Sequence, residues 1–309
     1  MAGRAPHHLA GAPPSHPRIL EAPLSVAPPT VTDMATLPNP LPKLATDPTG
    51  GVLGLQLPPG RLLDATVEGP WHEPLLWLAD EEAAPGAWAA LAPARRSAGL
   101  LSVVIDAGGR HGGPELWELA PEAMSYPGDH DAEEVLADLW DEYAAGETEE
   151  EWPGLADAPA PVPTSVSTSA PVSADDPDAV ATDIADSLAE SGGLLEEPRL
   201  ALVPARRSAD IPAAIGWTGP VNHESDVARL CAVLRSWEDR FGIRVVALGF
   251  DQLLVSVAFP PTILAEAEAV AAEHFAFCPD NILQSGDPTV GAYAEKRLLN
   301  QPAWHFWWD

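Results

Sequence analysis

The chain ends in Trp304-His305-Phe306-Trp307-Trp308-Asp309, a stretch with four large aromatic rings in its last six residues. Free chain ends are usually polar and frayed, because few contacts hold them. Large aromatic side chains instead supply much of the area that a protein core buries. We therefore expect this stretch to be the last strand of a folded domain, packed against other elements.

The geometry of a strand divides the terminal stretch into two faces. Alternate side chains point to opposite sides, so Trp304, Phe306 and Trp308 should share one side and pack into the core. His305 and Trp307 would share the other side. That second side has two interpretations: a surface groove that binds a partner or ligand, or a face covered by a neighbouring helix.

Two further segments are dense in aromatic and charged residues, Trp237-Glu238-Asp239-Arg240-Phe241-Gly242 and Glu273-His274-Phe275-Ala276-Phe277-Cys278-Pro279-Asp280-Asn281. With the terminal stretch, they make residues 198–309 resemble the bacterial family called domain of unknown function 4253. Residues 46–150 resemble, more weakly, the region that often precedes this domain. The family brings no established activity, so the resemblance implies a domain and no particular chemistry.

The segment 198–309 alternates strand and helix patterns. The predicted order is a strand at 199–203, a helix beginning after Asn222 or Ser225, a hairpin of strands at 243–250 and 253–259, helices at 260–278 and 289–299, and the terminal strand. Gly242 stands where a left-handed cap would end the first long helix. The order is compatible with an α+β fold of ferredoxin-like type, βαββα with an extra helix and a final aromatic strand.

Residues 46–150 have the pattern of a small α/β-type N-terminal domain. Short apolar runs bounded by Gly, Pro or Asp predict strands at residues 51–55, 75–78 and 100–105. Residues 87–91 and 131–145 predict helices, and the second of these is amphipathic with an acidic outer face. Asp129 or Asp131 could cap its start.

Two other segments hold too few large apolar residues to offset the entropy of ordering the chain. Residues 1–45 are rich in Pro and Ala, and we expect them to be disordered. Met34 opens a passage that looks like a natural start, so translation could begin at Met1 or at Met34. Residues 151–197 predict an acidic linker rich in Pro, Ser and Ala, with one marginal helix near 180–188.

The net charge of −30 is distributed unevenly. Residues 129–197 contain 20 Asp and Glu and no Lys or Arg, so 20 of the 30 excess negative charges lie in this stretch. A field of this sign repels phosphate backbones, so we expect no nucleic-acid binding. A basic protein partner, or simple solubility, fits the charge better.

Composition also restricts the compartment. No apolar run approaches the ~18 residues that a membrane span requires, and the N-terminal residues lack the continuous apolar run of a signal peptide. The two cysteines, Cys231 and Cys278, lie among apolar residues with helical spacing, so we interpret them as reduced thiols. We therefore expect a cytoplasmic protein that does not bind membranes.

His274 is the strongest candidate for chemistry. The helical pattern turns it inward, where a neutral histidine held by a hydrogen bond is one explanation, and a cleft histidine with a shifted pKa is the other. His274 and Cys278 are spaced i and i+4, as a thiolate nucleophile and its base, or two zinc ligands, would require. Glu273 and Asp280 are the remaining catalytic candidates. No complete set of metal ligands or cofactor motif is present, so we expect neither metal nor cofactor.

Trp237 and Arg240 end the first long helix, where an arginine complements the helix dipole. A structural role is one interpretation. In the other, Arg240 binds Asp280 or the terminal Asp309 and joins the three motifs. We therefore take Trp237, Arg240 and Asp309 as candidate binding residues, together with His305 and Trp307.

These observations favour a non-enzymatic protein-binding module that acts in the manner of inhibitor or immunity proteins. The alternative is a hydrolase or transferase of unknown type that uses His274 with Cys278, Glu273 or Asp280. Geometry separates the two: a solvent-open pocket around these side chains would favour the enzyme, and a sealed apolar setting would remove it.

Overall fold

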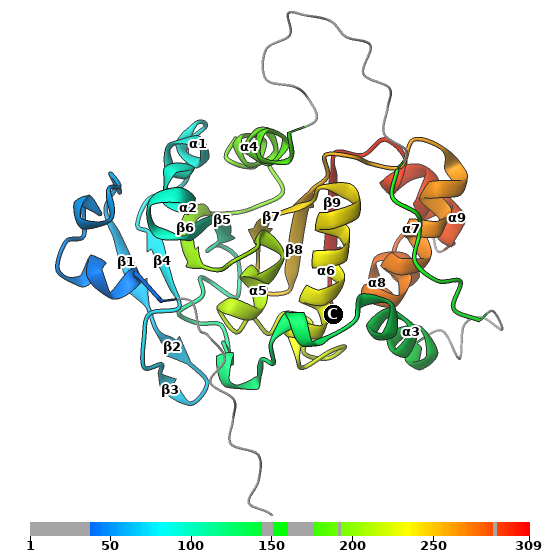
Figure 1. Cartoon of the computed structure of the whole chain (residues 1–309), viewed down its shortest axis with the longest axis horizontal. Coiled ribbons are helices and arrows are strands. Elements are labelled where there is room, and N and C mark those ends of the chain that lie inside the picture. The colour runs from blue at the N-terminus through cyan, green and yellow to red at the C-terminus, as the bar shows by residue number, and fades with distance from the viewer. Residues whose placement is uncertain (1–37, 144–150, 160–175, 191–192, 287–288) are drawn as a thin grey trace, which may run out of the picture. The chain divides into compact units, whose positions relative to one another are not determined.

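In a computed structural model of the 309-residue chain, the structure describes residues 38–143, 151–159, 176–190, 193–286 and 289–309 (Figure 1). All of these residues belong to one compact unit, Leu37–Asp309. The unit combines helices with a mixed sheet, so the predicted α+β class is confirmed. Among the described residues, no helix is both long and apolar enough to cross a membrane.

A mixed seven-stranded sheet forms the centre of the fold. In spatial order its strands are β1 (Gly60–Leu63), β4 (Leu76–Ala79), β6 (Pro198–Pro204), β5 (Leu100–Asp106), β7 (Arg244–Leu248), β8 (Gln252–Ser256) and β9 (Ala303–Trp307). Neighbouring strands are antiparallel except β5 and β7, which are parallel. A separate small hairpin joins β2 (Ala65–Thr66) to β3 (Gly69–Pro70).

One sheet combines strands from both of the domains that we expected at 46–150 and 198–309. Strand β5 lies between β6 and β7, and it pairs with β6 along its whole length, from Leu100 opposite Pro204 to Asp106 opposite Pro198. Val103 and Val104 point to opposite faces and are both buried. A strand buried on both faces needs a neighbour at each edge to pair its backbone, and the C-terminal segment supplies both neighbours.

Strand order also differs from the ferredoxin-like arrangement. A split βαβ unit has two parallel strands with one strand between them. Strand β5 does lie between β6 and β7, but β6 is antiparallel to β5, and β5 is parallel to β7. Strands β6 and β7 therefore run in opposite directions.

Helices cover the two faces of the sheet in separate groups (Figure 1). One face carries α3 (Ala132–Tyr143), α5 (Ile211–Ala214), α6 (Val227–Phe241) and α7 (Leu264–Phe277). The other carries the short helices η1 (Leu41–Ala45) and η2 (Gly51–Leu53) with α1 (Ala87–Leu91), α2 (Pro93–Ala98) and α4 (Pro177–Leu188). Beside α7 lie α8 (Asp280–Leu283), α9 (Val290–Tyr293) and a π-helical turn, Ala294–Leu298.

Local predictions succeed where caps and periodicity agree. Asp131 caps α3 by accepting from the backbone N–H of Glu133, at 2.9 Å. Gly242 ends α6 with a left-handed φ of 62°, as predicted. The strand predicted at residues 51–55 is wrong, because Gly50 and Gly54 adopt left-handed conformations, with φ of 78° and 71°, and curl the segment into η2.

The predicted disordered segments are partly folded. Helix α4 is the helix that we predicted near residues 180–188 of the linker, and it buries Ala181, Ala185 and Leu188 against the sheet. Residues 41–45 of the expected N-terminal disorder form η1, and Leu41 is fully buried. Residues 1–37 of that prediction, including Met34, fall outside the described residues.

Candidate functional site

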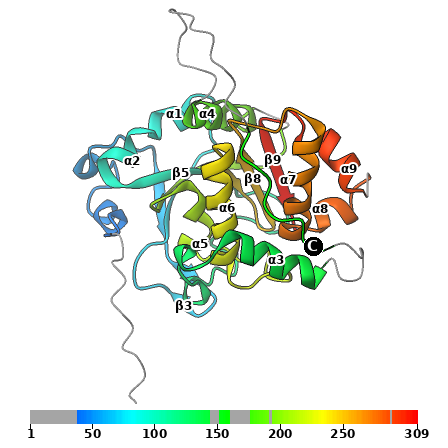
Figure 2. The ribbon, with the colours of Figure 1, turned by 45° about the vertical axis from the view of Figure 1, so that its right-hand side comes forward.

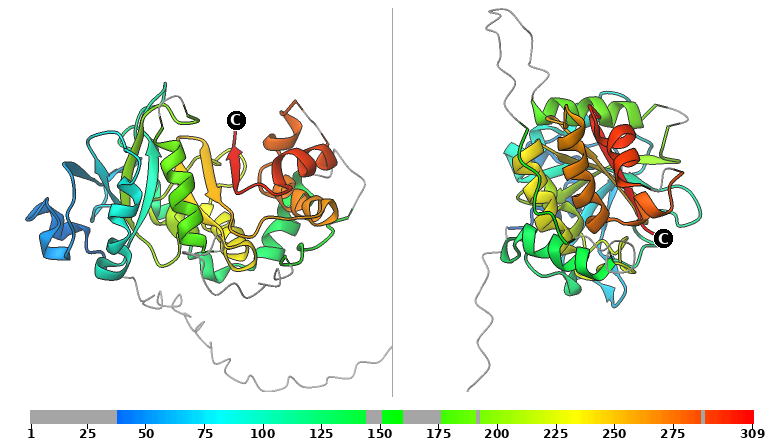
Figure 3. Two further views of the ribbon diagram at one scale, coloured as in Figure 1. Left: turned by 90° about the horizontal axis from the view of Figure 1, so that it is seen from above. Right: turned by 90° about the vertical axis from the view of Figure 1, so that its right-hand side faces the viewer.

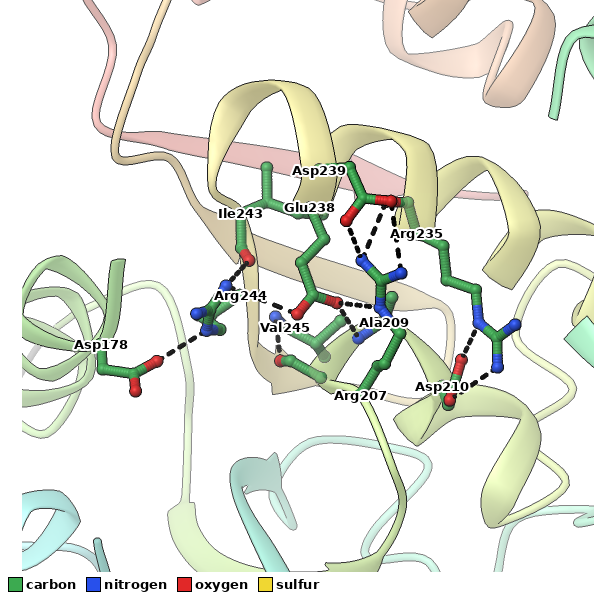
Figure 4. Close-up of polar contacts among 11 residues, drawn as sticks. Asp178, Arg207, Ala209, Asp210, Arg235, Glu238, Asp239, Ile243, Arg244 and Val245 are labelled. Carbon is green, nitrogen blue, oxygen red and sulfur yellow. Dashed lines mark hydrogen bonds and ion pairs between the residues drawn. The ribbon is translucent and has the colours of Figure 1, made fainter. Parts of the chain in front are cut away.

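One turn of α6, Trp237 to Arg240, is the centre of the site. Asp226 caps the start of the helix, where its carboxylate accepts from the N–H of Ala228 at 3.2 Å. The apolar residues of the helix recur at steps of three and four. This periodicity turns Trp237 into the core, where it is fully buried. Glu238 and Asp239 point away from the core toward a loop that follows β6 (Figure 4).

Arg240 and Glu273 form a buried ion pair between α6 and α7. Guanidinium nitrogens Nη1 and Nη2 of Arg240 lie 2.7 and 2.6 Å from the two carboxylate oxygens of Glu273. The indole N–H of Trp237 and the backbone N–H of Ala156 also donate to Glu273, each at 2.7 Å. Glu273 therefore accepts four hydrogen bonds at 0% exposure, and Arg240 binds it rather than Asp280 or Asp309.

His274 is enclosed by aromatic rings. Its ring centroid lies 4.6 Å from that of Trp304 and 4.7 Å from that of Phe306. Its Nδ1 is 3.0 Å from the hydroxyl of Tyr293, whereas Nε2 has no hydrogen-bond partner among the described residues. Burial, and secondarily the charge of Arg240, lower the pKa of His274 well below its usual range. The imidazole is therefore held neutral.

Cys278 is also sealed in the core. Its thiol donates to the backbone carbonyl of Trp307 at 3.0 Å, and burial raises its pKa, so the thiolate is disfavoured. Helix α7 ends at Phe277, and Cys278 caps it through its backbone N–H, which donates to the carbonyl of His274 at 2.8 Å. The two side chains bond to different partners, Tyr293 and Trp307, and not to each other.

Asn281 holds the outer edge of β9, a contact that sequence reasoning missed. Its side-chain N–H donates to the carbonyl of His305 at 2.7 Å, and its carbonyl accepts from the N–H of Trp307 at 3.2 Å. The amide thus replaces a neighbouring strand at the sheet edge. Asp280 accepts from the backbone N–H of Asp309 at 3.1 Å, so the segment that runs from Glu273 to Asn281 also holds the chain end.

The terminal strand has the two faces that its sequence predicts. Trp304, Phe306 and Trp308 are buried in the core that α6 and α7 share. His305 and Trp307 lie on the opposite face and are partly exposed, with His305 bonded to Gln252 at 3.2 Å. Burial and the charge of Arg297 lower the pKa of His305.

The three motifs that suggested a family thus meet in one packed cluster of α6, α7 and β9. Residues 199–309 match the family described as Domain of unknown function (DUF4253). The match confirms the resemblance expected for residues 198–309. No curated protein and no solved structure matches the chain.

The DUF4253 segment, residues 199–309, begins inside β6 and excludes β5, the strand that separates β6 from β7. It also excludes Ala156, whose backbone bonds to both Arg240 and Glu273. The sheet and the buried pair of the DUF4253 segment are therefore completed by residues from elsewhere in the chain.

A second polar network surrounds the outer side of α6 (Figure 4). Arg207 binds Asp239 at 2.6 Å and Glu238 at 3.3 Å. Arg244 binds Glu238 at 3.5 Å and Asp178 of α4 at 2.7 Å. Glu238 therefore links the loop after β6 to the start of β7, and through Arg244 to the opposite helical layer.

Arg235 extends this network toward α3. It makes a two-point ion pair with Asp210, at 2.5 and 2.9 Å, and its guanidinium lies 5.1 Å from the ring centre of Tyr126. The hydrogen bonds that Arg235 donates to the carboxylate of Asp210 raise the pKa of Arg235. Local sequence carries no signal for this pair, because Asp210 and Arg235 belong to different elements.

An open cleft of about 390 Å³ lies between α6 and the start of α3. Its walls include Arg207, Arg235, Arg240, Asp239 and Leu155. Each of the three arginines is bound to a carboxylate, so the cleft lacks the unpaired positive charge that an anion site would use. Within the described part of the chain, no group of three or more His, Cys, Asp or Glu residues could hold a metal ion.

Proposed function

We propose that the protein is a non-enzymatic protein-binding module, in the manner of inhibitor or immunity proteins, and that it binds a basic surface of its partner. One observation carries the proposal: Glu273, His274 and Cys278 are each 0% exposed and hydrogen-bonded inside the core. A general base or nucleophile must reach a substrate. These side chains instead hold α7 to its neighbours.

The binding surface in this proposal is an acidic ridge on α3. The ridge consists of exposed carboxylates on the helix and at its cap: Asp131, Glu133, Glu134, Asp138, Asp141 and Glu142. Clustered charges of one sign attract a surface of the opposite sign and accelerate its association. The packing of Leu136, Leu139 and Trp140 into the core fixes which side of α3 faces outward.

The test is co-purification of the tagged full-length protein from its native host. Glu134→Lys with Asp141→Lys reverses two exposed acids seven residues apart on the ridge. We expect a stoichiometric protein partner to co-purify with the unaltered chain and to be lost with this double variant. The two new lysines would repel the basic groups of the partner.

The matched control is Asp183→Lys with Glu190→Lys, which reverses two exposed acids, also seven residues apart, on and just after α4. It changes the net charge equally on the other helical layer, and the partner should be retained. Equal loss in both variants would show a non-specific charge effect. Absence of any stoichiometric partner of the unaltered chain would contradict the proposal.

A further inference from the structure

A short extended segment, residues 151–159, crosses the surface of α6 and α7, and we call it the strap. Figures 2 and 3 show it as a thin green trace beside these two helices. It belongs to the stretch that sequence reasoning assigned to a linker. Ala156 is its one buried residue, at 6% exposure, and it lies over the Arg240–Glu273 pair.

The contact at Ala156 has the form of a peptide clamp. The carboxylate of Glu273 accepts from the N–H of Ala156 at 2.7 Å, and Arg240 donates to the carbonyl of the same residue at 2.7 Å. Both polar groups of one residue are therefore bound by one ion pair. Because Arg240 and Glu273 bind only the backbone N–H and carbonyl of Ala156, any residue small enough to fit could replace it.

The clamp does not depend on the strap for its own geometry. Arg240 and Glu273 bond to each other through two hydrogen bonds, and Trp237 holds the carboxylate from inside the core. Removing the strap would take one donor from Glu273 and one acceptor from Arg240, and the two hydrogen bonds within the ion pair would remain. The surface below the strap is thus preorganised for an extended peptide.

The strap itself is held by few side chains. Trp152 packs against Trp140 of α3 with ring centroids 5.6 Å apart, but it is only partly buried. Its indole N–H is buried without a hydrogen-bond partner among the described residues. Leu155 is partly buried and lines the open cleft beside α6. Segments with few buried apolar contacts open most readily.

We propose that the strap is an exchangeable occupant of a peptide-binding surface, and that an extended segment of a partner protein binds there in its place. The strap defines the chemistry of that segment: a small residue at the clamp and an aromatic residue four positions earlier. The inference rests on the proposed binding function and deepens it, because it names an extended peptide as a ligand on a surface other than the acidic ridge.

The geometry restricts the ligand at two positions. Ala156 is buried between α6 and α7, so a large side chain at the clamp would displace the peptide. Gly154 has a φ of 87°, a left-handed conformation that favours glycine between the aromatic anchor and the clamp. An aromatic residue, a glycine two positions later and a small residue two positions after that would therefore fit best.

The experiment uses the full chain and a labelled peptide with the sequence of residues 151–159. The variant Trp152→Ala with Ala156→Glu removes the anchor and places a carboxylate against Glu273, so its own strap should leave the surface. We expect this released variant to bind the peptide at least about tenfold more tightly than the unaltered chain, where the attached strap competes at a high effective concentration.

Two matched controls isolate the clamp. The variant Glu151→Gln with Asp157→Asn changes exposed strap residues, and it should bind the peptide no better than the unaltered chain. A peptide with Leu in place of Ala156 should bind the released variant at least about tenfold more weakly, because the clamp lies at a buried position. This second control leaves the protein unchanged.

Three results would overturn the inference. A released variant that melts cooperatively but does not bind the peptide would show that the surface has no affinity for it. Loss of cooperative melting in that variant would make the strap a fixed part of the fold. A dimer of the unaltered chain with strap crosslinks between copies would assign the surface to a second copy. None of these results depends on the acidic ridge, so the two proposals can fail separately.

Discussion

The carboxylate of Glu273 joins three parts of the chain, since it lies on α7 and accepts three hydrogen bonds from α6 and one from the strap. A buried carboxylate of this kind is stable only while its partners remain. The intact Arg240–Glu273 pair therefore adds little to the free energy of unfolding. Removal of one partner lowers it strongly, because the other charge stays buried and unpaired.

We predict that Glu273→Gln lowers the free energy of unfolding by about 3–5 kcal/mol, because Arg240 would remain in the core without a counter-charge. Urea denaturation of the two proteins measures the difference. Glu268→Gln, at an exposed position on the same helix, should change it by less than about 0.5 kcal/mol. A loss below about 1 kcal/mol for Glu273→Gln would show that water or another group satisfies Arg240.

Histidine burial predicts sensitivity to acid. Burial lowers the pKa values of His223, His274 and His305 in the folded protein. Well above pH 6.5, the ordinary histidine pKa, these groups are neutral in both the folded and the unfolded state. Below it, the unfolded chain binds protons that the folded chain does not, so each histidine removes up to about 1.4 kcal/mol of stability per pH unit until its folded pKa is reached.

The measurement is the free energy of unfolding between pH 7 and pH 5, which should fall as the pH falls. His274→Phe should flatten this slope by up to about 1.4 kcal/mol per pH unit, because the variant has no imidazole to protonate. His72→Gln changes an exposed histidine and serves as the control. A slope that is unchanged in His274→Phe would mean that the folded protein already accommodates the charged ring.

At the scale of elements, β9 shows how a sheet edge is closed without another strand. One amide, Asn281, bonds to the N–H of Trp307 and the carbonyl of His305. The spacing of apolar residues along the sequence predicts the helix that precedes Asn281. The contact of Asn281 with β9 instead joins residues more than twenty positions apart. Local periodicity has no information on such pairs, which is why α6 was predicted well and the role of Asn281 was not.

Asn281→Ala should lower the free energy of unfolding by about 1–3 kcal/mol, because it leaves two backbone groups of β9 without partners. The uncovered edge should also promote self-association, which sedimentation velocity would detect. Gln284→Ala, an exposed change just after α8, is the control. Equal effects of the two changes would indicate that Asn281 acts only through helix stability.

Deleting residues 304–309 should abolish cooperative melting. The deletion removes Trp304, Phe306 and Trp308 from the core and leaves β8 without one neighbour. Loss of large buried aromatic side chains costs about 3–5 kcal/mol each, which exceeds the margin of most domains. Differential scanning calorimetry provides the measurement, and an unchanged melting temperature would show that the terminal strand is dispensable.

For the whole molecule, the pairing of β5 with β6 and β7 decides what can fold alone. Short apolar runs revealed β4, β5 and β6 as strands, and the composition favoured an α+β class. Which strands become neighbours depends on the packing of segments far apart in the sequence, so the separate domains expected at 46–150 and 198–309 could not be tested by local patterns. The candidate site shows the same limit, since Ala156 reaches it from outside the matched segment.

A fragment of residues 198–309 should therefore fail to fold, although it contains all three motifs. Without β4 and β5, strand β6 has neither of its neighbours, and β7 keeps only β8. A fragment of residues 38–309 should fold and melt cooperatively. Circular dichroism and amide exchange would compare the two, and a cooperative transition in the shorter fragment would show that the DUF4253 segment can close its own sheet.

The place of β5 in the sheet also has a consequence for biosynthesis. The ribosome makes this apolar strand well before β6 and β7. During translation, the backbone N–H and C=O groups at both edges of β5 are therefore unpaired until those two strands have been made. Such strands aggregate or recruit chaperones until the chain is complete. Premature termination between β5 and β7 should thus yield an insoluble product rather than a smaller folded one.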